Sequence, residues 1–354
     1  MDFTSLITPK IIAANYTEAA SNRVPYLGET LFPAQKKMGL DLSWIKASNG
    51  IPVSLMPTAF DAKATFRELE GISKTETEMP FFREGFMISE KDRQELLRAN
   101  ETNDPYLASI LGRIFNYSEN LVNAADIVPE RMRMALMFPE NGNMVINFKA
   151  NGVNYSYNYD SNGNWKTNNY SALTSTDLWS ASTSADPIKN FIDIASKAAG
   201  VSGAEIKYAV MSPNTFNRMV STDALKNRWL STAGISMGYI TNNEAADIIS
   251  RTTGITPISY GKKYKDESKT TRPFVPDGYV SFIPEGSIGT TWYGTTPEEA
   301  DLMASSAAEV SIVNTGVAIT TVKTTNPVNT QIFASEIVLP SFERMDEVFT
   351  LKVL

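Results

Sequence analysis

One stretch of the chain, from about Ser89 to Phe138, carries the longest sustained helical pattern in the sequence. Asp104-Pro105 predicts a helix start, because aspartate caps a helix and proline fits its first position. Residues that would share one stripe then recur at alternating steps of four and three: Leu107, Leu111, Ile114, Ser118, Leu121, Ala125 and Val128. Pro129 should kink the helix or restart it. Such a length suits either a core helix or the spine of a flattened subunit.

The segments before this helix carry a different pattern. Residues 1 to 40 contain proline- and glycine-marked turns and too little periodicity for a packed domain, which indicates an extended arm. Residues 61 to 104 are dense in both acids and bases, as expected of a solvated face or of a loop that reaches a neighbouring subunit. Within that stretch, Ser89 and Asp92 approximate a capping box and predict a short charged helix to about Ala99.

The composition removes much of the usual catalytic chemistry. The 354 residues suffice for two or three domains, yet they include no cysteine and no histidine. Disulfides, thiolate zinc sites and the commonest general base are therefore excluded. A formal net charge of −7 argues against nucleic-acid binding by charge. We also expect no membrane span and no secretory signal, since no run approaches ~18 apolar residues and no charged-then-apolar leader is visible.

After the long helix, the dipeptide Asn151-Gly152 is a strong hairpin signal, because a two-residue type I′ turn needs positive φ at both positions. Pairing across that turn predicts four cross-strand pairs: Ala150 with Val153, Phe148 with Tyr155, Ile146 with Tyr157 and Met144 with Tyr159. One face of this hairpin should be apolar and aromatic.

From Asp186 onward, helices and strands alternate. Asp186-Pro187 predicts a helix to Gly200 with a core face of Ile188, Phe191, Ile192 and Ala195. Further helices are predicted from Ser212-Pro213 and over 243–253, and strands over 206–211, 255–260 and 279–284, which indicates an α/β domain. The basic stretch 262–272 predicts a solvated polar loop. Enrichment in β-branched residues predicts C-terminal strands over 309–313, 317–324, 332–339 and 348–354.

Several stretches match part of a known catalytic or metal-binding motif but lack a residue that the motif requires. Gly234-Ile235-Ser236-Met237-Gly238 matches a nucleophile elbow, but no histidine exists to activate Ser236 as a serine hydrolase would require. The residues from Asp160 to Asn164 have the spacing of a calcium loop, yet Trp165 stands where that loop needs glycine. The adjacent acids Glu298 and Glu299 are either acid/base groups or, more simply, solvated surface. We therefore expect no catalytic residue, no cofactor and no metal ion.

The order of these parts resembles the major capsid protein of tailed bacteriophages, specifically the lambda-type major capsid protein family. No single motif is diagnostic, but their order and spacing over nearly the whole chain carry the resemblance. The residues concerned are Tyr26-Leu27-Gly28-Glu29 with Leu31-Phe32-Pro33, Gly50-Ile51-Pro52-Val53, Met79-Pro80-Phe81-Phe82-Arg83-Glu84, Ile88-Ser89-Glu90-Lys91-Asp92-Arg93-Gln94, Val210-Met211-Ser212-Pro213, Pro276-Asp277-Gly278, Pro284-Glu285-Gly286, Tyr293-Gly294 and Leu339-Pro340.

The resemblance implies an α+β chain with the Hong Kong phage-type major capsid fold. By that analogy, residues 1–40 are an N-terminal arm and residues 41–88 an extended β-loop. A peripheral domain with the long spine helix takes residues 89–186 and 326–354, and an axial α/β domain takes residues 187–325. The absence of a long helical extension before the arm implies that scaffolding is a separate protein.

The implied function is structural: a virion subunit, assembled in the host cytoplasm as hexamers and pentamers into an icosahedral shell around double-stranded DNA. Its expected partners are other copies of itself, a scaffolding protein and a portal, with or without a decoration protein; DNA is near it only non-specifically, and no membrane is involved. Candidate self-assembly residues in the charged stretch are Arg67, Arg83, Glu84, Glu90 and Arg93. The alternatives are an encapsulin-like nanocompartment shell, a tail or baseplate protein, and a serine hydrolase at Ser236.

Overall fold

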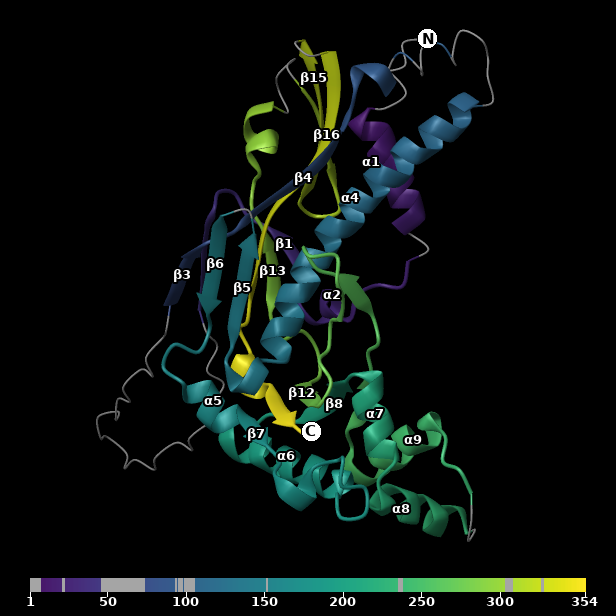
Figure 1. Cartoon of the computed structure of the whole chain (residues 1–354). Coiled ribbons are helices and arrows are strands. Elements are labelled where there is room, and N and C mark those ends of the chain that lie inside the picture. The colour runs from purple at the N-terminus through teal and green to yellow at the C-terminus, as the bar shows by residue number, and fades with distance from the viewer. Residues whose placement is uncertain are drawn as a thin grey trace, which may run out of the picture. The chain divides into compact units, whose positions relative to one another are not determined.

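The computed structural model describes residues 8–20, 23–45, 74–92, 94, 98, 106–150, 152–234, 238–302, 308–325 and 328–354. The chain forms two compact units, each assembled from separate stretches of sequence, and Figure 1 labels many of their elements. Unit 1 consists of Met1–Ser43, Glu76–Arg131 and Thr290–Ser341. Unit 2 consists of Trp44–Thr75, Met132–Gly289 and Phe342–Leu354. The boundaries of these units are not those of the four parts expected from the sequence, and that four-part division stays a prediction.

Unit 1 is built on a sheet whose central strand is the 14-residue β16 (Val328–Ser341). One half of β16 pairs antiparallel with β15 (Val317–Thr325) on one side and with β4 (Phe81–Ile88) on the other. Its other end pairs with β13 (Thr290–Tyr293), which in turn pairs parallel with β1 (Ala34–Lys36). Beyond β15 lies β14 (Glu309–Val313). Two further short strands, β2 (Asp41–Ile45) and β3 (Lys74–Glu78), pair with each other.

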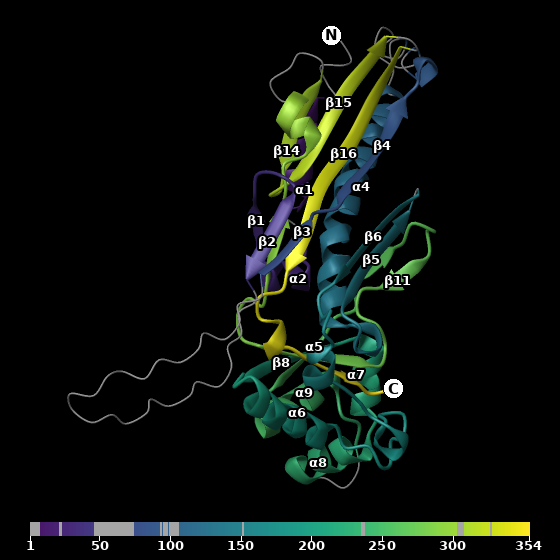
Figure 2. The ribbon, with the colours of Figure 1, turned by 90° about the vertical axis from the view of Figure 1, so that its left-hand side faces the viewer.

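Two helices cover this sheet in unit 1: α1 (Pro9–Ala20) and the first part of α4 (Tyr106–Met137) (Figure 2). Their apolar side chains form one cluster with the strands, in which Ile12 and Tyr16 meet Ile114 and Val122. The extended conformation predicted for residues 1–40 is therefore wrong for α1 and for the short helix α2 (Leu27–Leu31). Burial of Ile12 and Tyr16, four positions apart, shows that one face of α1 is a core face.

The predicted long helix is confirmed as α4, which runs for 32 residues. Of the two alternatives predicted at Pro129, a kink or a restart, the restart does not occur, because the helix continues through this residue. The buried stripe also differs from the predicted one: after Ile114 and Ser118 it follows steps of four through Val122 and Asp126, whereas Leu121 is only partly buried. The stripe thus brings charged side chains into the interior of unit 1.

Unit 2 contains a five-stranded sheet in the order β7 (Tyr170–Ala172), β17 (Phe349–Lys352), β12 (Tyr279–Pro284), β8 (Ile206–Met211), β9 (Thr256–Ser259). Its helices are α6 (Pro187–Val201), α7 (Pro213–Val220), α8 (Asp223–Ala233) and α9 (Asn242–Thr253). The core centres on Phe191 and Phe282, whose rings meet edge to face at 5.0 Å. The predicted α/β alternation is confirmed. Other short helical segments among the described residues are α5 (Asn164–Asn169), Glu140–Gly142, Ser175–Asp177, Glu298–Leu302 and Met345–Glu347.

The predicted helix starts in unit 2 are confirmed by their caps. The Asp186 side chain accepts a hydrogen bond from the Lys189 amide, and Ser212 accepts one from the Thr215 amide. The predicted core face of α6 is wrong at Ile192, whose side chain is exposed, while Ile194 and Ala198 are buried. The polar loop predicted at 262–272 is instead a small hairpin of β10 (Lys263–Lys265) and β11 (Thr271–Pro273).

The hairpin predicted at Asn151-Gly152 is confirmed as β5 (Val145–Ala150) and β6 (Val153–Asn158). Phe148 pairs with Tyr155, and Ile146 with Tyr157, in the predicted register. Gly152 has a φ of 80°, whereas Asn151 lies outside the described residues. The Asp160 carboxylate accepts hydrogen bonds from the Trp165 and Lys166 amides, so this segment is a turn that leads into α5, as predicted.

This turn gives a direct test of the hairpin assignment. A Cβ at Gly152 would meet no atom within 4 Å, so any penalty of substitution comes from the backbone conformation alone. Gly152→Val should lower the free energy of unfolding by about 1 kcal/mol or more, because β-branched residues resist positive φ. Gly152→Asn is the matched control and should lower it less, since asparagine tolerates that region. Equal melting midpoints for both variants and the wild type would contradict the assignment.

Candidate assembly surface

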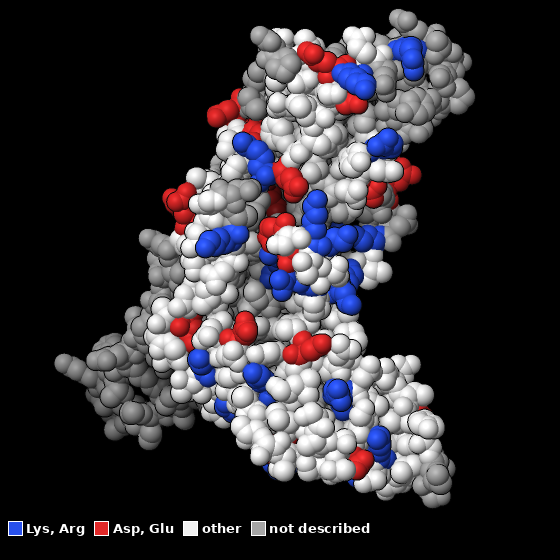
Figure 3. Space-filling model, in the orientation of Figure 1, with Lys and Arg blue, Asp and Glu red and all other residues white. Residues whose placement is uncertain are grey.

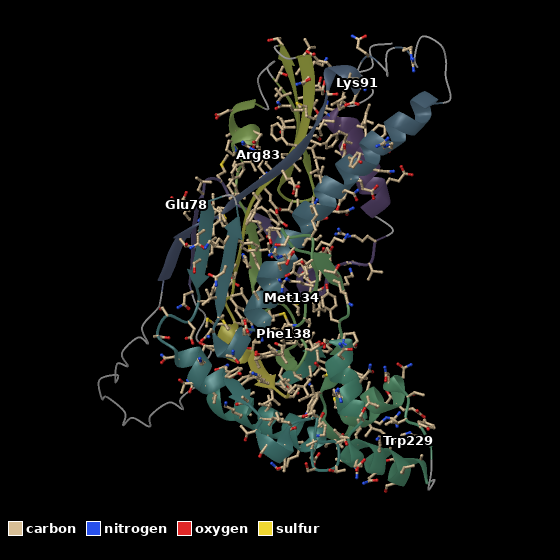
Figure 4. The ribbon with its side chains drawn as sticks, in the orientation of Figure 1. Glu78, Arg83, Lys91, Met134, Phe138 and Trp229 are labelled. Carbon is tan, nitrogen blue, oxygen red and sulfur yellow. The ribbon has the colours of Figure 1, made fainter. Side chains whose placement is uncertain are left out.

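The candidate assembly residues that the structure describes lie on and just after β4, which Figure 4 shows carrying Arg83. Antiparallel pairing with β16 sets Arg83 opposite Ser335 and Glu84 opposite Ala334. Because side chains alternate along a strand, Arg83 and Glu84 project from opposite faces of the sheet. Arg67 and Arg93, the other two predicted cations, lie outside the described residues.

Arg83 has a partner within its own chain. Its guanidinium forms an ion pair with Glu298, whose carboxylate also accepts a 2.9 Å hydrogen bond from the Ser335 hydroxyl. Only 2% of the Glu298 side chain is exposed, against 45% of the Arg83 side chain. Arg83 thus neutralises a buried carboxylate on one side and remains open to solvent on the other.

Aromatic rings hold the Arg83 guanidinium in place. It lies over the ring of Phe81 at 4.7 Å and over that of Phe333 at 5.5 Å from the centroid, distances at which a cation is attracted to the ring face. Gly85 makes room for this arrangement, because a Cβ there would come within 2.6 Å of the Phe333 Cβ. Arg83 is therefore a fixed group rather than a freely moving surface cation.

The two predicted acids differ from each other. Glu84 is exposed and forms no ion pair with any residue in the described part of the chain. Glu90 accepts a 2.7 Å hydrogen bond from the Val328 amide at the start of β16. Ser89 and Asp92 exchange the hydrogen bonds of the predicted capping box. Glu84 is thus the predicted residue most available to a neighbouring molecule.

Neither of the adjacent acids Glu298 and Glu299 is simple solvated surface. Both begin the short π-helical segment Glu298–Leu302. Glu298 forms the ion pair with Arg83 described above. The two carboxylate oxygens of Glu299 accept hydrogen bonds from the Lys36 ammonium at 2.6 and 2.7 Å. The two ion pairs fasten this segment to β4 and β1, which are distant from it in sequence.

A second charged cluster, not anticipated from the sequence, surrounds Asp126 on α4. This buried carboxylate accepts hydrogen bonds from the Tyr16 hydroxyl, from Arg23 at 2.7 Å and from Asn314 at 2.8 Å. Burial, and then the neighbouring Asp126, raises the pKa of Tyr16 well above its usual value. One turn further along α4, Glu130 accepts a 3.2 Å hydrogen bond from the Gly28 amide. The sequence did contain a signal for this burial, because Asp126 and Glu130 continue the four-residue spacing of the buried stripe beyond Val122.

The candidate nucleophile Ser236 lies outside the described residues. None of the described acids are grouped so that three or more could hold a metal ion. No helix in this part of the chain is long and apolar enough to cross a membrane. On the face drawn in Figure 3, cations and anions are interspersed over most of the surface, and several cations gather near the middle of the face, to the right of centre.

Comparison with known proteins gives a consistent result. The family model described as phage major capsid protein E matches residues 13–353. The structure is similar to the putative capsid protein of a prophage of E. coli CFT073, with a TM-score of 0.58, 12% sequence identity and coverage of 98% of this chain and 99% of that one.

A phage-related protein from Bordetella bronchiseptica RB50 is also similar, with a TM-score of 0.52, 10% identity and coverage of 98% and 97%. At such identities the likeness shows the fold alone. No curated protein matches the sequence.

The ion pair between Arg83 and Glu298 can be tested in a double-mutant cycle. Arg83→Met should lower the free energy of unfolding by about 3 kcal/mol, because it leaves a buried carboxylate without its counter-charge. Combining it with Glu298→Gln should recover much of that loss, since no charge then remains buried. Chemical unfolding of the free subunit measures all four proteins. Strictly additive effects would show that the two side chains are not coupled.

Proposed function

Since the chain belongs to the phage major capsid protein E family, we propose that it is the shell subunit of a tailed bacteriophage head, assembling as hexamers and pentamers into an icosahedral shell around double-stranded DNA. The observation that carries this proposal is the family match over residues 13–353. The role of the protein is structural and its place is the virion capsid. The α+β capsid fold expected from the sequence is confirmed by the similarity to the prophage capsid protein.

The proposal also assigns a structural role to each part of the chain. Residues 1–40 act as the arm, 41–88 as the extended loop, 89–186 with 326–354 as the peripheral domain, and 187–325 as the axial domain. The partners are other copies of the chain, a separate scaffolding protein and a portal, with or without a decoration protein. Assembly takes place in the host cytoplasm, and DNA is enclosed rather than specifically bound, in keeping with the net charge of −7.

We assign the contact between subunits to the charged stretch that contains Arg67, Arg83, Glu84, Glu90 and Arg93. Two observations support this assignment for the residues described. Glu84 is exposed without an ion pair to another described residue, and Arg83 keeps an exposed side while paired to Glu298. A single exposed pair contributes only about 0 to 1 kcal/mol, but a shell repeats it at every subunit.

The alternatives have less support. An encapsulin-like nanocompartment would share the fold, so the fold does not separate the two functions, but the matching family is one of phage capsid proteins. The same match disfavours a tail or baseplate protein. A serine hydrolase at Ser236 would need a base other than histidine, because the sequence has none.

The proposal predicts assembly. The chain, expressed alone or with its scaffolding protein, should form closed shells, aberrant shells, tubes or capsomers far larger than one subunit, since repeated contacts between copies must close or polymerise. Negative-stain microscopy and sedimentation measure this. A strictly monomeric species over a wide range of protein and salt concentration would contradict the proposal.

The interface assignment predicts a selective effect at Glu84. Glu84→Lys should leave the circular dichroism and melting of the free subunit nearly unchanged while lowering the yield of shells, and added salt should weaken the difference by screening. Asp177→Lys, at another exposed acid, is the matched control and should assemble as the wild type does. Wild-type yield and salt dependence for Glu84→Lys would remove Glu84 from the interface.

A further inference from the structure

The hairpin of β10 and β11 in unit 2, whose second strand is labelled in Figure 2, is a concentrated basic element in an acidic chain. Positions 262 to 272 hold five basic and two acidic residues, so the rest of the chain is more acidic than the net charge of −7 alone indicates. The two strands of the hairpin are short, and every residue of β11 is exposed.

The two faces of this hairpin differ. Tyr264 lies opposite Arg272 in the register, and its ring stacks obliquely on that of buried Phe274 at 4.8 Å, which anchors this face to the unit. Lys263 and Lys265 lie opposite Pro273 and Thr271, so strand alternation turns them to the other face. Lys269 lies in the connecting turn with a φ of 61°.

The turn is braced by Asp266. Its carboxylate accepts hydrogen bonds from the Ser268 and Thr270 amides at 3.0 and 2.9 Å and from the Arg272 side chain at 2.5 Å. The hydrogen bond from Arg272, followed by that from Thr270, lowers the pKa of Asp266. The Asp266 carboxylate therefore stabilises the backbone of the hairpin itself.

Three other cations of the hairpin, all of them lysines, face solvent. Lys263, Lys265 and Lys269 are exposed, and their ammonium groups form no ion pair with any residue that the structure describes. Because the turn is already braced, the backbone beneath these lysines needs little further ordering to meet a partner, which favours binding.

We propose that this hairpin docks against a carboxylate-bearing surface on a second copy of the chain. Charge complementarity favours that occupant: outside the hairpin the chain is strongly acidic, and a shell brings many acidic copies together, so like-charge repulsion must be offset. The proposal rests on the proposed function, since it requires an assembly. Duplex DNA is the competing polyanion, and the acidity of the chain as a whole disfavours it.

Zero-length carbodiimide cross-linking tests the proposal, because it joins an amine to a carboxylate only where the two are in contact. Shells are assembled from an equal mixture of ¹⁴N- and ¹⁵N-labelled subunits, and cross-linked peptides are identified by mass spectrometry. We expect mixed-isotope peptides that join Lys263, Lys265 or Lys269 to an aspartate or glutamate. They should be present in shells and absent from dissociated subunits.

A charge-reversal pair provides the functional readout. Lys263→Glu with Lys265→Glu should lower shell yield several-fold while subunit melting stays near that of the wild type. The matched control is Lys10→Glu with Lys149→Glu, two exposed lysines whose ammonium groups likewise pair with no described residue, which changes the net charge equally. It should reduce yield much less.

Three outcomes would overturn the inference. The first is the absence of mixed-isotope cross-links at these lysines together with equal yields for the two variants. The second is protection of the lysines from acylation in DNA-filled shells alone, which would identify DNA as the partner. The third is failure of the wild-type chain to assemble at all, which would remove the proposed function and this inference with it, whereas the first two leave the proposed function intact.

Discussion

Unit 1 depends on one constraint: a carboxylate that leaves water must find hydrogen-bond donors or a cation. Asp126 is carried into the interior by the same helical spacing that buries Val122. Three donors satisfy it, two from the N-terminal segment (Tyr16 and Arg23) and one from Asn314. Leaving such a group without partners would cost several kcal/mol. The arrangement of the N-terminal segment against α4 is thereby fixed by charge as well as by the apolar contacts of Ile12.

The same constraint recurs at the sheet, where Glu298 is satisfied by Arg83 and Ser335. The pairing links the π-helical segment Glu298–Leu302 to β4 and β16, which are far apart in sequence but are neighbours in the sheet. A shell repeats each contact many times, so a subunit whose segments shifted would pass the error to every neighbour. Fixed internal ion pairs are a physical means to hold the exposed side of Arg83 and the neighbouring Glu84 in a constant position.

Local sequence patterns predict those structural features whose determining residues are close together in the sequence. The register of β5 and β6 follows from Asn151-Gly152, and the start of α6 from Asp186-Pro187. Long-range features were not accessible: pairing of β4 with β16, burial of Asp126 and the partner of Arg83 all depend on residues one hundred or more positions away. The helix α1 was missed although Ile12 and Tyr16 share a face, because so short a stripe predicts little alone. Ile192 is exposed, and Ile194 joins the core cluster of unit 2 instead.

The most direct test of the role of the buried carboxylate is amide hydrogen exchange on the free subunit carrying Asp126→Ala. If Asp126 holds the N-terminal segment in unit 1, peptides from α1 and α2 should exchange markedly faster than in the wild type, while peptides from β12 and α6 in unit 2 should be unchanged. Unaltered exchange in α1 and α2, or a uniform increase over both units, would contradict the account.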